Sequence, residues 1–162
     1  MSNTLTKSNV IAREGFDFVG NCTRTTNKVE MTADRRIPKL WDDFYKNEVL
    51  EAITHKKNSN VLAIYTDYET NEHGAYTFAL GAQVRDNNLV PNGMESIQIP
   101  DQKYIVFTTR KGPLPGVIIE AWEEIWKWSE KRERAYGADF ELYDERAMDP
   151  NNGQVDIYIS VK

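Results

Sequence analysis

Two similar stretches decide the fold of this chain: LWDDFYK at Leu40–Lys46 and AWEEIWK at Ala121–Lys127. In each stretch a tryptophan is followed by two acidic residues and then by further large apolar residues at helical spacing. Each stretch also follows a segment rich in Thr, Arg and Lys and precedes two runs of β-forming residues. The repetition predicts a strand-helix-strand-strand module given twice, with a pocket lined by aromatic rings where the copies meet.

Residue patterns predict the elements of both copies. The first helix takes Asp34 as its cap and Pro38 in its first turn, and it ends before the polar loop at 54–60. The second helix runs from about Val117 to Arg134. The predicted strands are 16–26, 61–68, 75–84, 102–109, 140–144 and 155–161. Strands that follow one another as hairpins, with helices between them, indicate an α+β fold with antiparallel sheets.

The length of the chain fits one domain built from two fused modules. Its 162 residues are enough to bury most of the apolar surface around one core. The first module spans about 10–85 and the second about 95–162, and the junction at 86–94 is rich in Asn and contains Pro and Gly.

Composition excludes several classes of function. The net charge of −5 and the pI near 5.1 argue against a broad phosphate-binding surface, so we expect no direct nucleic-acid binding. No run of about 18 apolar residues that could span a membrane occurs, and the polar start at 1–9 does not resemble a signal peptide. With one cysteine, Cys22, and no ligand spacing around His55 and His73, we expect a cytoplasmic protein without a cofactor or metal site.

Glu141 is the charged residue that stands out. It interrupts Asp139-Phe140-Glu141-Leu142-Tyr143, where alternation puts Phe140 and Leu142 on one strand face and Glu141 and Tyr143 on the other. If the second face opens onto the rings of the two helices, namely Trp41, Tyr45, Trp122 and Trp126, a carboxylate stands beside an aromatic box. Such a box binds organic cations by cation–π attraction, at roughly 0.5–2 kcal/mol for each ring.

Ordinary structural roles would also explain these residues. A glutamate on the polar face of a strand is usually exposed, and aromatic residues at helical spacing are usually core. Neither histidine lies near a plausible nucleophile, so classical nucleophilic catalysis is not expected.

The order of several short motifs resembles one known family. These motifs are Phe18-Val19-Gly20, Thr23-Arg24-Thr25-Thr26, Tyr104 before a Gly-Pro break, Ala121-Trp122, Phe140-Glu141-Leu142-Tyr143 and Asp156-Ile157-Tyr158-Ile159. From about Val10 to Lys162 the chain resembles the GyrI-like small-molecule-binding family, the effector-binding domain of AraC-type and MerR-type regulators. The resemblance implies two modules related by a pseudo-twofold axis, with a ligand groove between them.

The resemblance also implies site residues and partners. Glu141 matches a strand glutamate that pairs with lipophilic cations, and Trp122 matches an aromatic residue beside the ligand. Tyr76, Tyr143 and Tyr158 are further carry-overs. The chain looks like the stand-alone members, including cationic-drug-binding proteins encoded on mobile gene cassettes such as integron cassettes, so a DNA-binding partner would act in trans.

Two alternative functions remain open at this point. Some GyrI-like proteins hydrolyse reactive xenobiotics, and Glu141 would then act as a general base on water. Other relatives resemble gyrase inhibitors, for which an acidic domain would bind a basic protein surface. We expect a binding module rather than an enzyme.

Overall fold

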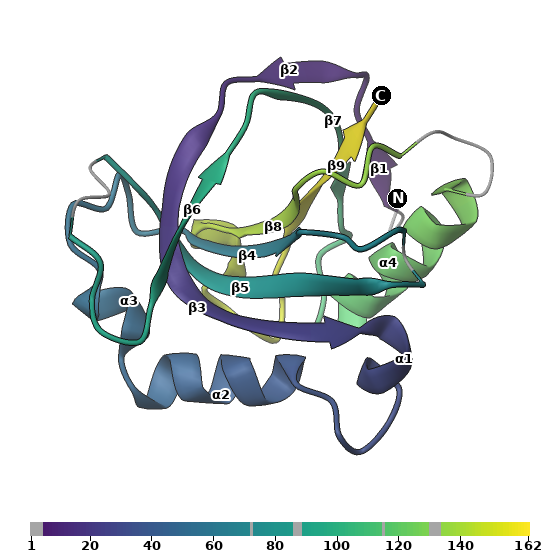
Figure 1. Ribbon diagram of the computed structural model, residues 1–162. Helices are drawn as coiled ribbons and strands as arrows, with labels where there is room; N and C mark the ends of the chain where they lie inside the picture. Colours follow the sequence, from purple (N-terminus) through teal and green to yellow (C-terminus); the bar gives the residue numbers. More distant parts are fainter. Residues whose placement is uncertain (1–4, 72, 86–88, 115, 130–133) are drawn as a thin grey trace.

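A computed structural model describes residues 5–71, 73–85, 89–114, 116–129 and 134–162 of the chain (Figure 1). The strands are β1 (Thr6–Lys7), β2 (Ile11–Arg13), β3 (Phe16–Thr26), β4 (Val61–Thr66), β5 (Ala75–Val84), β6 (Glu95–Ile99), β7 (Gln102–Thr108), β8 (Asp139–Tyr143) and β9 (Asp156–Val161). The helices are α1 (Asn27–Glu30), α2 (Ile37–Lys46), α3 (Val49–Ala52) and α4 (Gly116–Ser129), with a 3₁₀ turn, η1, at Glu145–Ala147.

The described strands form one antiparallel sheet. Its order is β1-β7-β9-β8-β4-β5-β3-β6, and β2 also pairs with β7. The order is symmetric about the β4–β8 pair, because β5 and β9 flank that pair and β3 and β7 lie outside them. Strand-helix-strand-strand therefore occurs on both sides of one central seam. The predicted α+β class with antiparallel strands is confirmed.

Alternation along the central strands separates two faces of the sheet. Leu62 and Ile64 of β4 and Phe140 of β8 enter a core inside the curl of the sheet, together with Phe18. The neighbouring residues point to the other face, where α2 and α4 pack (Figure 1). Phe44, Val49 and Ile53 anchor α2 and α3 there, and Val117, Ala121 and Ile125 anchor α4.

Several predicted elements have different bounds or neighbours in the structure. The first helix begins at Ile37 after Arg36, whose side chain makes no capping bond, so the predicted Asp34 cap is wrong. The second helix is described from Gly116 to Ser129, and Arg134 is in a bridge with Val161 rather than in the helix. Of the predicted junction, residues 86–88 lie outside the described residues.

Short peripheral strands were not predicted from the sequence. β6 pairs with β3 at the edge of the first half, whereas β1 and β2 pair with β7 of the second half. The chain start therefore crosses to the far half of the sheet before β3 begins. Within the described residues, no helix is both long and apolar enough to cross a membrane.

A pair of glycines lies where β3 and β5 leave no room for a Cβ. Gly20 and Gly81 lie opposite each other in the register. A Cβ added to Gly20 would meet the backbone of Leu80 and Gly81, and one added to Gly81 would meet the backbone of Val19 and Gly20. Because backbone atoms cannot move aside as a flexible side chain can, only glycine fits at either position.

We expect Gly20→Ala and Gly81→Ala each to lower the free energy of unfolding by about 1–3 kcal/mol, because the added methyl forces the two strands apart. Gly116→Ala is the matched control, since a Cβ there would meet nothing within 4 Å. Urea unfolding of the three variants checks this. Equal stability of Gly20→Ala and Gly116→Ala would contradict the close approach of β3 and β5.

Candidate functional site

Glu141 is a buried carboxylate held by three side-chain donors. Only 2% of its surface is exposed. Its Oε2 accepts hydrogen bonds of 2.8 Å from the Tyr65 hydroxyl and of 2.8 Å from the Trp122 indole N–H, and its Oε1 accepts one of 2.6 Å from the Tyr143 hydroxyl. The donors come from β4, α4 and β8, so the cluster joins the central strand pair to the second helix.

The local sequence explains why these groups converge. Glu141 and Tyr143 alternate with Phe140 and Leu142 along β8, so they share the face on which the helices pack. On β4, Ala63 lies directly opposite Glu141, and Tyr65 is two residues further along. A small residue opposite the carboxylate leaves room for the longer diagonal neighbour to reach it.

Burial determines the protonation of the cluster. Loss of solvent raises the pKa of the Glu141 carboxyl, and the hydrogen bonds from Tyr143, Trp122 and Tyr65 lower it in part. Burial, together with the adjacent Glu141 charge, raises the pKa of Tyr65 and of Tyr143 well above the ordinary tyrosine value. Both hydroxyls therefore remain protonated at neutral pH and donate to Glu141.

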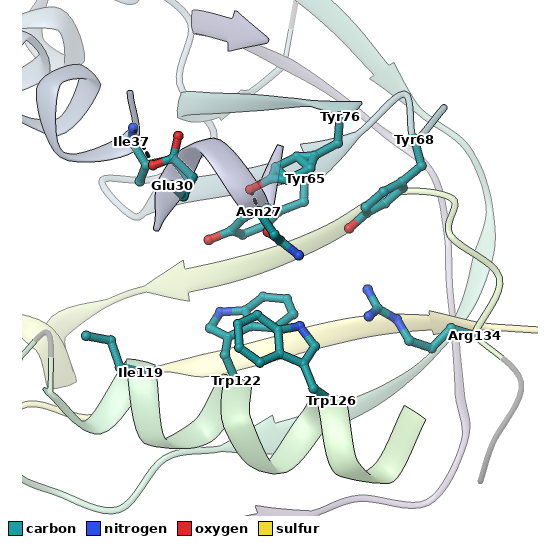
Figure 2. A pocket seen from close by; sticks show the side chains of 10 residues that line it. All are labelled: Asn27, Glu30, Ile37, Tyr65, Tyr68, Tyr76, Ile119, Trp122, Trp126 and Arg134. Carbon is teal, nitrogen blue, oxygen red and sulfur yellow. Dashed lines mark hydrogen bonds between the residues drawn. The ribbon is translucent and has the colours of Figure 1, made fainter. Parts of the chain in front are cut away.

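A pocket of about 230 Å³ lies in front of this cluster, between α4 and the segment around α1 (Figure 2). Half of its lining residues are aromatic: Trp122 and Trp126 from α4 lie on one side, and tyrosines from and beside β4 and β5 lie on the other. The full lining is Asn27, Glu30, Ile37, Tyr65, Tyr68, Tyr76, Ile119, Trp122, Trp126 and Arg134. Glu141 stands directly behind this wall, because its donors Tyr65 and Trp122 are lining residues.

The rings of the wall contact one another. The Tyr65 centroid lies 5.1 Å from Trp122 and 5.7 Å from Tyr76, and Trp122 lies 6.3 Å from Trp126. These separations fall in the range of favourable aromatic pairs. The aromatic rings on the two sides of the pocket therefore contact each other through Tyr65 and Trp122.

Two further charged groups lie at the ends of the pocket (Figure 2). Glu30 accepts hydrogen bonds from the backbone N–H groups of Arg36 and Ile37 and from the Thr25 hydroxyl. At the other end, Arg134 forms a buried ion pair of 2.7 Å with Asp139. One end of the pocket is thus acidic, and a guanidinium lies at the other.

The structure brings together most of the residues that the sequence singled out. Trp122, Trp126 and Tyr76 line the pocket, and Glu141 and Tyr143 lie behind it. Trp41 and Tyr45 are not among the lining residues of the pocket. The Trp41 ring centroid is 5.1 Å from Tyr143 and 5.9 Å from Tyr45, which is 67% exposed.

Tyr158 does not reach this cluster. Its ring stacks on Phe140 with centroids 4.4 Å apart, in the core on the opposite face of the sheet. The reason is the alternation of β9, because Ile157 and Ile159 take the face that packs against α4. The predicted placement of Tyr158 in the pocket is corrected accordingly.

Sequence reasoning did not single out several lining residues as site residues. These residues are Tyr65, Tyr68, Glu30, Asn27, Ile37, Ile119 and Arg134. Tyr65 could have been found by applying to 61–66 the alternation argument used for Glu141. No local signal marks Arg134, whose position depends on its buried partner Asp139.

The comparisons with known proteins agree with this fold. A family model described as integron-associated effector binding protein (Cass2) matches residues 10–161. The chain belongs to this family. The "Putative transcriptional regulator protein YobU" of Bacillus subtilis (strain 168) is 38% identical over 146 residues, covering 90% of this chain and 91% of YobU.

Solved structures extend the family relationship. An integron cassette protein from the mobile metagenome of Vibrio cholerae has a TM-score of 0.76 and 30% identity, covering 98% of this chain and 99% of that one. The SAV2435 protein, solved bound to tetraphenylphosphonium, has a TM-score of 0.78 and 18% identity, covering 95% and 93%. At that identity the likeness to SAV2435 concerns the fold alone. This family member therefore has the architecture of an effector-binding, regulator-like protein.

We expect Glu141→Gln to become more stable relative to the wild type as the pH rises. The raised pKa means that folded protein holds the Glu141 proton more tightly than unfolded protein. Wild-type stability therefore falls as the pH rises from the ordinary carboxyl value through the raised one. Glutamine has no such proton, so the difference in unfolding free energy, variant minus wild type, increases over that window and is constant above it.

Urea unfolding at a series of pH values from about 4 to 8 measures this difference. A difference that decreases with pH would mean that the native structure lowers the pKa of Glu141.

Proposed function

We propose that this protein binds lipophilic organic cations in the aromatic pocket, with Glu141 as the counter-charge behind the wall. The observation that carries the proposal is a buried carboxylate with neutral donors around it. Among the described residues, no Lys or Arg forms an ion pair with Glu141, and all three of its donors are tyrosine hydroxyls or an indole. A buried negative charge without a positive partner attracts a cation that can leave water.

The pocket wall suits such a ligand. Five aromatic rings line it, from Tyr65, Tyr68, Tyr76, Trp122 and Trp126. Each ring face attracts a cation by roughly 0.5–2 kcal/mol, so a few contacts plus one charge interaction are enough for micromolar affinity. Glu30 lines the pocket and adds a second carboxylate to that of Glu141 behind the wall. The charges of Arg134 and Asp139 cancel in their ion pair. The local charge is therefore negative.

The hydrogen bonds of Glu141 favour a counter-charge over a general base. A carboxylate offers about four acceptor positions, and three of those of Glu141 are already occupied. A general base needs a free lone pair directed at the water that it activates. Glu141 is better arranged to stabilise charge than to remove a proton.

Relatives support the proposal by analogy. SAV2435, which shares the fold, was solved bound to tetraphenylphosphonium, a lipophilic cation. YobU carries a regulator's name, and this chain matches nearly its whole length. We therefore propose that cation binding serves regulation, with DNA contacted by a partner protein in trans.

We expect Glu141→Gln to weaken tetraphenylphosphonium binding by more than tenfold. At an effective dielectric of 20 a unit charge contributes about 4 kcal/mol at a separation of 4 Å and about half of that at twice the separation, and both values exceed the energy of a tenfold change. Triphenylmethane, a neutral probe of similar shape, should lose no more than about twofold, because it has no charge to stabilise. Quenching of tryptophan fluorescence, with Trp122 and Trp126 in the wall, measures both affinities.

Glu123→Gln is the matched control for this test. Glu123 neighbours Trp122 in α4 but is exposed, so its removal changes the same net charge without touching the buried cluster. Equal weakening by Glu141→Gln and Glu123→Gln, or equal loss for the cationic and neutral probes, would reject the role of Glu141.

A further inference from the structure

Arg134 has more hydrogen-bond donors than the structure satisfies. Its side chain is 2% exposed, and Nη2 donates to Asp139 Oδ2 at 2.7 Å. Within the part of the chain that the structure describes, neither Nε nor Nη1 has an acceptor. An unsatisfied buried donor costs about 1–3 kcal/mol, and more when it is charged, so such groups are rare in folded proteins.

Asp139 cannot accept these additional donors. Its Oδ1 already accepts from the Ser160 backbone N–H and hydroxyl, and its Oδ2 accepts from Tyr68 as well as from Arg134. All of the carboxylate's usual acceptor positions are therefore occupied. Nε and Nη1 of Arg134 therefore cannot be satisfied by Asp139.

The backbone beside Arg134 is strained in a way that holds the guanidinium. Tyr136 has a φ of 52°, in the left-handed region that aromatic residues rarely adopt. Its ring lies 4.5 Å from the Arg134 Cζ, and it also packs against Tyr68. The guanidinium is thereby stacked and oriented rather than free to turn toward solvent.

The guanidinium is directed at the pocket. Arg134 is a lining residue, and Figure 2 shows its charged end pointing between Tyr68 and Trp126, at the opposite end from Glu30. Nε and Nη1 belong to this lining side chain and are themselves buried. Trp126, which also lines the pocket, is 42% exposed.

We propose that Arg134 forms a second polar subsite, which binds an oxygen acceptor, a carbonyl or carboxylate, on the same ligand whose cationic group lies over the aromatic wall. The protein's ligands are then dipolar: an aromatic or alkyl onium group near Glu141 and Glu30, joined by a linker to an acceptor group at Arg134. This proposal rests on the proposed function, because it adds an oxygen acceptor to the cationic ligand proposed for the same pocket.

Three triphenylphosphonium probes of equal length test the subsite: pentyl, carboxybutyl, and the primary amide of carboxybutyl. We expect wild-type protein to bind the amide and the carboxylate about tenfold more tightly than the pentyl compound, the factor that one net hydrogen bond to a charged group supplies. Probes with shorter and longer alkyl chains are included, so that in one of them the chain has the length needed to bring the acceptor group to Arg134. Calorimetry or tryptophan quenching gives the affinities.

Arg134→Lys keeps the charge beside Asp139 but removes the planar set of donors. In this variant the affinity for the amide or the carboxylate, divided by the affinity for the pentyl compound, should fall to within about twofold of one, because the acceptor contact is lost. Arg110→Lys is the matched control, since Arg110 pairs with Glu120 at the surface and is not part of this pocket. If Arg134→Lys fails to fold, the double variant Arg134→Met with Asp139→Asn removes both charges together and supplies the comparison.

The possible outcomes separate this proposal from the proposed function. If the pentyl compound binds but wild-type protein shows no preference for an acceptor at any linker length, the Arg134 subsite is wrong and cation binding stands. If the preference persists in the Arg134 variants, the acceptor binds elsewhere and the proposal is also overturned. If no triphenylphosphonium compound binds, the proposed function fails and this proposal fails with it.

Discussion

The buried carboxylate of Glu141 is the interaction on which the site depends. Its three donors come from β4, β8 and α4, so the hydrogen bonds tie the central strand pair to the second helix. A charged oxygen in the interior is costly unless such bonds replace water. An apolar residue would pack there without that cost, which is why we regard the charge itself as functional. The tyrosines and the indole position the carboxylate without neutralising it.

The seam between the two halves of the sheet explains where the pocket lies. The face of the sheet that carries the helices is covered by α2 in the first half and by α4 in the second, and α1 contributes Asn27 and Glu30 to the pocket between them. The rings of Tyr65 and Trp122 meet across this gap. Glu30 and Arg134 lie at opposite ends of the pocket (Figure 2). The two ends therefore carry side chains of opposite charge.

Much of the fold could be predicted from the sequence, because long alternating runs and helical repeats are local signals. The strands at Phe16–Thr26 and Ala75–Val84 have the predicted bounds. β6 and the two short strands before β3 gave too weak a pattern, and their pairing depends on distant parts of the chain. In the site, alternation placed Glu141 and Tyr143 on one face, and the same argument applied to 61–66 would find Tyr65. That Tyr65 reaches Glu141 depends on the pairing of β4 with β8, and the position of Arg134 depends on its ion pair with Asp139. Local patterns therefore predict elements, whereas the site arises from contacts between them.

The most direct test of the account is the pKa of Glu141 itself, measured by carbon-13 NMR of labelled glutamate carboxyls, with Glu141→Gln used to assign the signal. We predict a pKa above the ordinary range in the free protein and a lower pKa when tetraphenylphosphonium is bound, because a nearby cation favours the ionised carboxylate. A pKa in the ordinary range would contradict the view that the effect of burial on Glu141 outweighs that of its three hydrogen bonds. A raised pKa that does not change on binding would show that the cation and the carboxylate do not interact.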